Sequence, residues 1–130
     1  MQITKNFTLE EFTKSETAKK FKIKNTPEDF EIENIINLVK NLMQPLRDHY
    51  NKPIIITSGF RCEELNRKIF GAFNSQHILG EACDFYVKGV NNKEVCNYIK
   101  DNMLFDQLIL EKSWIHVSYA QENREEYMIL

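Results

Sequence analysis

The sequence predicts an α+β fold, with a single domain over residues 1–130 and a small antiparallel sheet flanked by helices. Three observations support this prediction. The length of 130 residues suits one domain, and 42% hydrophobic with 28% charged residues is typical of a folded globular chain. Apolar residues follow a helical period in one long segment, whereas β-branched or alternating runs closed by turns occur elsewhere. No repeat or low-complexity tract divides the chain, so these helices and strands are expected to share one core.

The first predicted element is a short helix near the N-terminus. Thr8 and Glu11 have the spacing of a capping box, in which two side chains satisfy amide groups at the start of a helix. Phe7 and Phe12 stand where they could pack across that first turn. The helix is predicted to extend to about Lys20.

A loop over residues 21–27 and a second, longer helix from near Glu28 are predicted next. The apolar residues of this helix recur with a period of 3.6 and are Ile32, Ile35, Ile36, Val39, Leu42, Met43 and Leu46. Pro45 lacks an amide donor, which predicts a kink near the end of the helix.

The rest of the chain alternates between strands and helices. Strands are predicted over residues 53–57, 83–87, 107–111 and 114–119, and helices over residues 62–70 and 91–100. The first strand is a β-branched run ended by Ser58 and Gly59, and Asn91 or Asn92 can cap the last helix. The tail over residues 121–130 shows no pattern that assigns it to an element.

Charge and cysteine usage exclude several classes of protein. A formal net charge of -2 gives no basic field for nucleic acid. The three cysteines, Cys62, Cys83 and Cys96, form no CxxC motif, so buried thiols are expected and not a disulfide framework. No apolar run reaches the roughly 20 residues of a membrane span, and the N-terminus has no secretory pattern. We therefore expect synthesis in a cytoplasm, with no nucleic-acid or membrane partner.

His77, Asp84 and His116 are the candidate metal ligands. Strand alternation places Asp84 on the face opposite the apolar residues of its strand, and it places His116 on the face opposite Ile115 and Val117. His77 precedes Gly80 in a loop that could cover these faces. Two imidazoles and a carboxylate suit a catalytic Zn2+ with an open fourth position. Each residue alone also has an ordinary explanation, as a surface histidine or a structural acid.

The motif around these residues resembles that of a known family. The pattern Ser75-x-His77-x-x-Gly80-x-Ala82-x-Asp84, followed by Trp114-x-His116, is similar to that of the zinc D-Ala-D-Ala peptidases, the peptidase M15 family. The similarity runs roughly from residue 7 through residue 119 and is greatest to the short phage and prophage branch. It implies the D-Ala-D-Ala-peptidase-like fold, also called hedgehog-like, and it implies zinc on His77, Asp84 and His116.

Glu111 is the candidate general base. The resemblance implies an acid three residues before the last zinc histidine, but Ser113 occupies that position and cannot accept a proton in this way. If residues 112–113 form a two-residue turn, Glu111 pairs with Trp114 and shares a face with His116, whereas Asp106 lies on the opposite face. Glu111 is therefore preferred to Asp106, and an ordinary solvated turn acid is the alternative for it.

Further residues are candidates for contact with a substrate. By resemblance, Arg61 binds substrate or polarises the scissile carbonyl, and a guanidinium fork suits a developing oxyanion. Ser75 is expected to donate a hydrogen bond to substrate or to support the His77 loop. Trp114, with Tyr86, could form the floor of a groove, although both could equally be packing residues.

These observations favour a zinc metallopeptidase that hydrolyses peptidoglycan stem peptides, as a D-Ala-D-Ala carboxypeptidase or an endolysin-type endopeptidase. The alternative is a catalytically weak or inactive zinc-binding structural or virion-associated domain of the same fold. A monomer is expected, with a peptidoglycan peptide as its partner. A phage or prophage origin would place its action at the bacterial cell wall, after release or as part of a virion.

Overall fold

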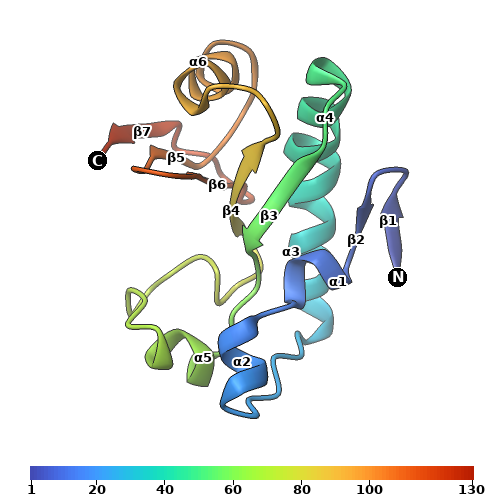
Figure 1. Cartoon of the computed structure of the whole chain (residues 1–130), viewed down its shortest axis with the longest axis vertical. Helices are drawn as coiled ribbons and strands as arrows, with labels where there is room; N and C mark the ends of the chain where they lie inside the picture. Colours follow the sequence, from blue (N-terminus) through green and yellow to red (C-terminus); the bar gives the residue numbers. More distant parts are fainter.

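A five-stranded mixed sheet is the centre of the fold, with strand order β3-β4-β6-β5-β7 (Figure 1). The computed structural model describes all residues 1–130. The strands of this sheet are β3 (Ile54–Ser58), β4 (Ala82–Val87), β5 (Gln107–Leu110), β6 (Ile115–Ser118) and β7 (Glu126–Ile129). The first four pair antiparallel, as predicted, and the α+β class with helices around one sheet is confirmed.

The tail contributes the strand that the sequence did not predict. Strand β7 pairs parallel with β5, which makes the sheet mixed instead of purely antiparallel. The backbone amide of Glu126 donates to the carbonyl of Asp106 at 2.9 Å, and that of Leu130 donates to the carbonyl of Leu110 at 2.9 Å. Strand β7 of the tail therefore pairs with every residue of β5.

The long predicted helix is present but changes its winding before Pro45. It consists of α3 (Asp29–Leu38), a π-helical segment η1 (Val39–Met43) and α4 (Gln44–Tyr50), without interruption. Pro45 has no amide to donate to the carbonyl four residues earlier, and a π segment is one way in which a helix accommodates such a defect. Asn51, at a φ of 51°, ends the helix in the left-handed conformation.

The N-terminal region differs from its prediction. A two-stranded ribbon, β1 (Gln2–Thr4) with β2 (Phe7–Thr8), precedes two short helices, α1 (Glu10–Thr13) and α2 (Glu16–Lys20). The prediction of one continuous helix was wrong, because Lys14 is extended and the Ser15 hydroxyl caps a new helix by accepting the Ala18 amide. Glu11 does accept the Thr8 amide at 2.7 Å, as the capping-box spacing indicated.

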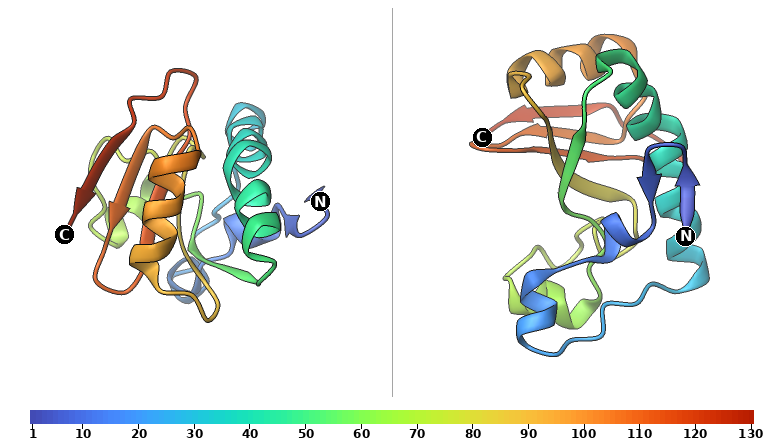
Figure 2. Two further views of the ribbon diagram at one scale, coloured as in Figure 1. Left: turned by 90° about the horizontal axis from the view of Figure 1, so that it is seen from above. Right: turned by 45° about the vertical axis from the view of Figure 1, so that its right-hand side comes forward.

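The core lies on one face of the sheet. Apolar side chains from β4, β5 and β6 pack there against α3, η1 and α6 (Asn92–Asn102), and Figure 2 shows these helices beside the sheet. Helix α5 (Glu63–Lys68) lies outside this layer, next to α2 (Figure 1). The second face of β4 and β6 is left for polar residues. No helix of the chain has both the length and the apolar composition that crossing a membrane requires.

Candidate metal centre

Strand pairing brings two of the predicted ligands together. Asp84 on β4 lies directly opposite His116 on β6, and the Nδ1 atom of His116 is 2.9 Å from Oδ1 of Asp84. Their neighbours Cys83, Phe85 and Ile115 point into the core and are fully buried. The two-residue alternation of each strand therefore presents both side chains on the face away from the core, as predicted.

His77 reaches the same point from the loop between α5 and β4. Its Nδ1 atom lies 2.7 Å from the carbonyl oxygen of Gly59, which fixes the proton on Nδ1 and leaves Nε2 as the free nitrogen. Nε2 lies 3.3 Å from Oδ1 of Asp84, and the side chain is only 4% exposed. A hydrogen bond from the second ring nitrogen to a carbonyl is the usual way in which proteins orient a histidine toward a metal.

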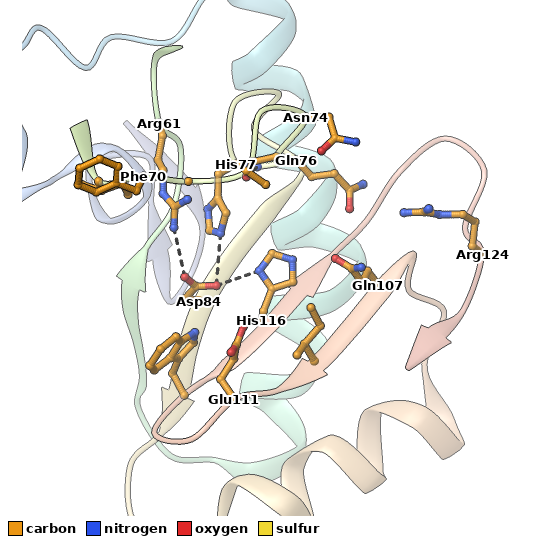
Figure 3. Close-up of a pocket in the computed structure, with 16 residues that line it drawn as sticks. Arg61, Phe70, Asn74, Gln76, His77, Asp84, Gln107, Glu111, His116 and Arg124 are labelled. Atoms are coloured by element: carbon orange, nitrogen blue, oxygen red, sulfur yellow. Dashed lines mark hydrogen bonds and ion pairs between the residues drawn. The ribbon is translucent and has the colours of Figure 1, made fainter. Parts of the chain in front are cut away.

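The three side chains form a convergent donor set. One ligand atom from each of His77, Asp84 and His116 lies within 4.8 Å of the other two (Figure 3). Burial alone would raise the pKa of Asp84, but hydrogen bonds from His116 and His77 outweigh it and hold that pKa well below its usual value. An ionised carboxylate and two imidazoles fit the chemistry of a zinc site with three protein ligands.

Arg61 supports the carboxylate from its other side. Its Nη2 atom is 3.5 Å from Oδ2 of Asp84, while Nε and Nη1 donate to Ser58 and to the buried Asn66 at 3.2 and 3.3 Å. Burial lowers the pKa of the Arg61 guanidinium, and the charge of Asp84 opposes that effect. Asp84 is thus held with Oδ2 toward Arg61 and Oδ1 toward both histidines.

A groove of about 600 Å³ opens over this centre (Figure 3). Its lining residues come from the segments before and after α5, from β4, β5, β6 and the turn between β5 and β6, and from the tail: Arg61, Ile69, Phe70, Gly71, Ala72, Asn74, Ser75, Gln76, His77, Asp84, Gln107, Ile109, Glu111, Trp114, His116 and Arg124. Of the eight residues that the sequence singled out for metal, catalysis or substrate, all but Tyr86 are in this set.

Glu111 lies where the hairpin register predicted it. Its amide donates to the carbonyl of Trp114 at 3.0 Å across the tight turn, and Ile109 pairs with His116. Figure 3 shows Glu111 below His116 in the groove. Ser113 lies in a separate depression with Tyr86.

Asp106, the rejected candidate base, has other partners. Its carboxylate accepts from Nε and Nη2 of Arg124 at 2.9 Å each and from Gln76 at 2.8 Å. The Arg124 hydrogen bonds lower the pKa of Asp106, against the opposing effect of burial. A buried carboxylate that already accepts several hydrogen bonds is poorly placed to accept a proton from water.

Two of the remaining substrate candidates line the groove and one does not. Ser75 lines the groove, and its hydroxyl accepts the His77 amide at 3.2 Å, so it supports the loop. Trp114 lines the groove and is 37% exposed. Tyr86 does not line it, because it stands two residues along β4 from Asp84, about 7 Å away.

Several groove residues carried no sequence signal. Gln76 bridges Glu81 and Asp106, and Gln107 donates to Glu126 at 2.9 Å. Phe70 and Arg124 also line the groove, and Phe70 is 94% exposed. The bonds of Gln76 and Arg124 to Asp106 join residues far apart in the chain, which local patterns do not record.

A groove whose base holds two imidazoles and an ionised carboxylate, beside an arginine and a second acid, defines a site of the metallohydrolase class. A sequence profile described as Peptidase M15 matches residues 5–118, so the chain belongs to the peptidase M15 family. No curated protein sequence matches the chain. The resemblance noted in the motif is thereby confirmed at the level of the family, and the chain is a peptidase.

Proposed function

We propose that this chain is a zinc metallopeptidase that hydrolyses peptide bonds of peptidoglycan stem peptides. The observation that carries the proposal is the convergence of His77 Nε2, His116 Nδ1 and the Asp84 carboxylate at the base of an open groove. Membership of the peptidase M15 family supports the same conclusion independently.

His77, Asp84 and His116 would hold the zinc ion. The Gly59 carbonyl and Arg61 keep two of these ligands in one orientation, so little ordering is needed when metal binds. Zinc in such a site supplies Lewis-acid polarisation of the scissile carbonyl and lowers the pKa of water to about 7.

Glu111 is proposed as the general base and acid. Its carboxylate would accept a proton from the attacking water and later donate it to the leaving amine. The support is its place in the groove on the strand register of His116, together with the full set of partners around Asp106.

Arg61, Ser75 and Trp114 are proposed to handle the substrate. Arg61 retains N–H groups on Nη1 and Nη2 beyond those bound to Asn66 and Asp84, and these could stabilise the oxyanion of the tetrahedral state. Trp114 offers an apolar surface on which a peptide side chain could lie.

The proposal covers two positions of cleavage in the stem peptide. A carboxypeptidase would release the terminal D-alanine, and an endopeptidase would cut further inside. From the resemblance of the motif to the short phage and prophage branch, we further propose a role in lysis or as a virion-associated enzyme that acts on the wall as a monomer.

The test combines metal content with turnover. Purified protein should retain about one zinc ion per chain, as a three-ligand site requires, and a chelator should abolish cleavage of muropeptides. Glu111→Gln should keep the zinc and lose about 10²- to 10⁴-fold in kcat, the usual contribution of a positioned acid or base.

Glu33→Gln is the matched control, because Glu33 is an exposed residue of α3 outside the groove. Full activity in zinc-free protein would refute the proposal. Stoichiometric zinc without cleavage in either the parent or Glu111→Gln would instead favour a binding domain of the same fold.

A further inference from the structure

Arg124 is the only charged groove residue that lies away from the metal centre. The other charged lining residues are Arg61 and Asp84, which contact each other, and Glu111, near His116. In Figure 3 Arg124 lies on the opposite side of His116 from Arg61. A peptide that crosses the metal centre along the groove would therefore meet a guanidinium at one end.

The orientation of this guanidinium is fixed by one buried acid. Nε of Arg124 donates to Oδ1 of Asp106 and Nη2 donates to Oδ2, both at 2.9 Å, and the backbone amide of Arg124 also donates to Oδ1. The Asp106 side chain is 3% exposed, whereas that of Arg124 is 58% exposed. The bidentate pair thus holds one edge of the guanidinium plane and leaves the other edge in the groove.

The free edge still has hydrogen-bond donors to offer. An arginine side chain has five N–H groups, and only two of those of Arg124 are used by Asp106. The nearest acid to Nη1 is Glu126, whose Oε2 lies 3.8 Å away, beyond hydrogen-bond distance. Glu126 is itself 44% exposed, so a substrate group could replace it at modest cost.

Resting on the proposed peptidase function, we propose that Arg124 determines specificity by binding a carboxylate of the peptide substrate. That carboxylate is either the C-terminus of the peptide or an acidic side chain within it. The neutral neighbours Asn74, Gln76 and Gln107 add amide groups that could bind the adjacent peptide backbone. Arg124 lies outside residues 5–118, so the family match assigns it no role.

The competing explanation is that Arg124 only anchors the tail through Asp106. An anchor would alter the binding of every peptide equally when it is removed. A specificity residue would alter only the binding of peptides that carry the recognised carboxylate. The two explanations are separated by comparing acidic and neutralised forms of one peptide.

Trp114 provides a measure of binding that needs no turnover. It is the single tryptophan of the chain and it lines the groove, so its fluorescence should report occupation of the groove. The ligands are a synthetic peptide with an internal glutamate and a D-Ala-D-Ala end, its glutamine analogue and its C-terminal amide. Zinc-loaded Glu111→Gln protein serves as the background, because it should bind these peptides without cleaving them.

We expect loss of the recognised carboxylate to weaken binding about tenfold, as for a charged hydrogen bond at a partly exposed site. If the C-terminal amide loses affinity, Arg124 binds the peptide end and the enzyme acts as a carboxypeptidase. If the glutamine analogue loses affinity, Arg124 reads an internal acid. Adding Arg124→Gln should make the acidic and neutralised peptides bind equally, and Arg124→Lys should keep part of the difference.

Two further variants make the test independent of folding defects. Asp106→Asn combined with Arg124→Gln removes both charges, so no buried carboxylate is left unpaired, and it should also lose discrimination. Glu126→Gln removes the competing acid and should tighten binding of the acidic peptide about twofold, a shift of the size expected for an exposed charge. Arg47→Gln, a partly buried arginine of α4 outside the groove, should change nothing.

The inference is overturned if Arg124→Gln weakens all three peptides equally, if discrimination persists in that variant, or if no peptide binds saturably. Cleavage of the same peptides by the zinc-loaded parent protein is measured separately. The zinc-loaded parent protein could bind the acidic peptide more tightly than its neutral forms and yet cleave none of them. That result would refute the proposed function, but it would still support a carboxylate-binding site at Arg124.

Discussion

The two ends of the groove are built in different ways. At the metal end, Asp84 and His116 sit on adjacent strands, and His77 is tied to the Gly59 carbonyl. At the other end, Arg124 comes from the tail. The side chain of His77 is 4% exposed, whereas that of Arg124 is 58% exposed.

This difference suits the buried end of the groove to catalysis and the exposed end to substrate recognition. Strand ladders fix the spacing of side chains to a fraction of an ångström, which catalytic and metal sites require. Loops and tails tolerate exchange of residues, and they commonly determine which ligand enters a site. We expect substitutions at the metal end to abolish metal binding, and substitutions at the exposed end to change selectivity with little effect on the fold.

The largest effect is expected from Asp84→Asn. An asparagine would place an amide nitrogen or a neutral oxygen where Oδ1 now faces both histidines, so the donor set loses its only anion. Zinc should be lost on dialysis, and kcat/KM should fall about 10³-fold or more, as when a preorganised charge is removed. Elemental analysis and peptide cleavage measure the two outcomes.

Asp101→Asn, at an exposed position on α6, is the control for Asp84→Asn. Retention of one zinc per chain in Asp84→Asn would show that Asp84 is not a ligand. The end of the groove that holds His77, Asp84 and His116 would then no longer be distinguished from the Arg124 end by metal binding.

A pair of glycines tests how firmly the His77 loop is held. Gly80 and Gly89 both have left-handed backbones, with φ of 77° and 79°. A Cβ at Gly80 would lie 2.5 Å from the carbonyl oxygen of Glu31 on α3, whereas one at Gly89 would meet nothing within 4 Å. Gly89→Ala should cost about 1 kcal/mol of unfolding free energy for its backbone conformation alone.

Gly80→Ala should cost about 3 kcal/mol, because a backbone clash adds to the same conformational term. It should also weaken zinc binding, since the loop must move away from α3 and it carries His77. Urea denaturation and zinc titration of both variants check this. Equal losses of stability in the two variants would mean that packing of the loop on α3 contributes nothing.

Asp106→Asn tests how much the ion pair of Asp106 with Arg124 contributes to holding the tail against the rest of the groove. The asparagine NH2 would face the N–H donors of Arg124 or Gln76, so this NH2 would be buried without an acceptor. About 1–3 kcal/mol of unfolding free energy should be lost at neutral pH. The free energy of unfolding is measured by denaturation across pH.

The pH dependence of this loss has a defined sign. The pKa of Asp106 is lower in the folded chain than its ordinary value of 3.8, so its stabilisation is complete above that value and disappears as pH falls through the folded pKa. The gap between the parent and Asp106→Asn should therefore shrink as pH falls from about 5 through the lowered pKa. A gap that is constant across this range would exclude the ionised pair as its cause.

The sequence predicted the arrangement of the candidate metal ligands because short patterns within single strands and turns determine it. Alternation in β4 and β6 assigns faces to Asp84 and His116, and a two-residue turn sets the register that brings Glu111 to the groove. The same alternation left the role of Tyr86 open, and the structure places Tyr86 outside the groove, about 7 Å along β4 from Asp84.

The exposed end could not be predicted for a physical reason. Strand β7 is fixed by parallel pairing with β5, and Arg124 by a carboxylate from a distant segment, so no short pattern marks either. The break between α1 and α2 was also missed, although Ser15 is a good capping residue, because the prediction used only the capping signals of the first turn at Thr8 and Glu11.

The smallest effect on stability is expected at two exposed aromatic residues, Phe70 of the groove and Phe73, which lines a neighbouring depression with it. Phe70 and Phe73 are 94% and 98% exposed, and Phe70 has a left-handed backbone with a φ of 60°. Since neither ring is buried, Phe70→Ser with Phe73→Ser should change the free energy of unfolding by no more than about 0.5 kcal/mol. Zinc content should also stay the same, because neither residue touches a ligand of the metal centre.

Peptide binding is where this double variant should differ from the parent. Phe70 lines the groove, so its ring can cover apolar parts of a bound peptide, and Kd should rise several-fold, about 1 kcal/mol for one partly buried ring. Trp114 fluorescence and thermal unfolding report the two quantities on the same sample. Loss of stability without loss of affinity would contradict the role of Phe70 in peptide binding, because the two rings would then serve the fold and not the ligand.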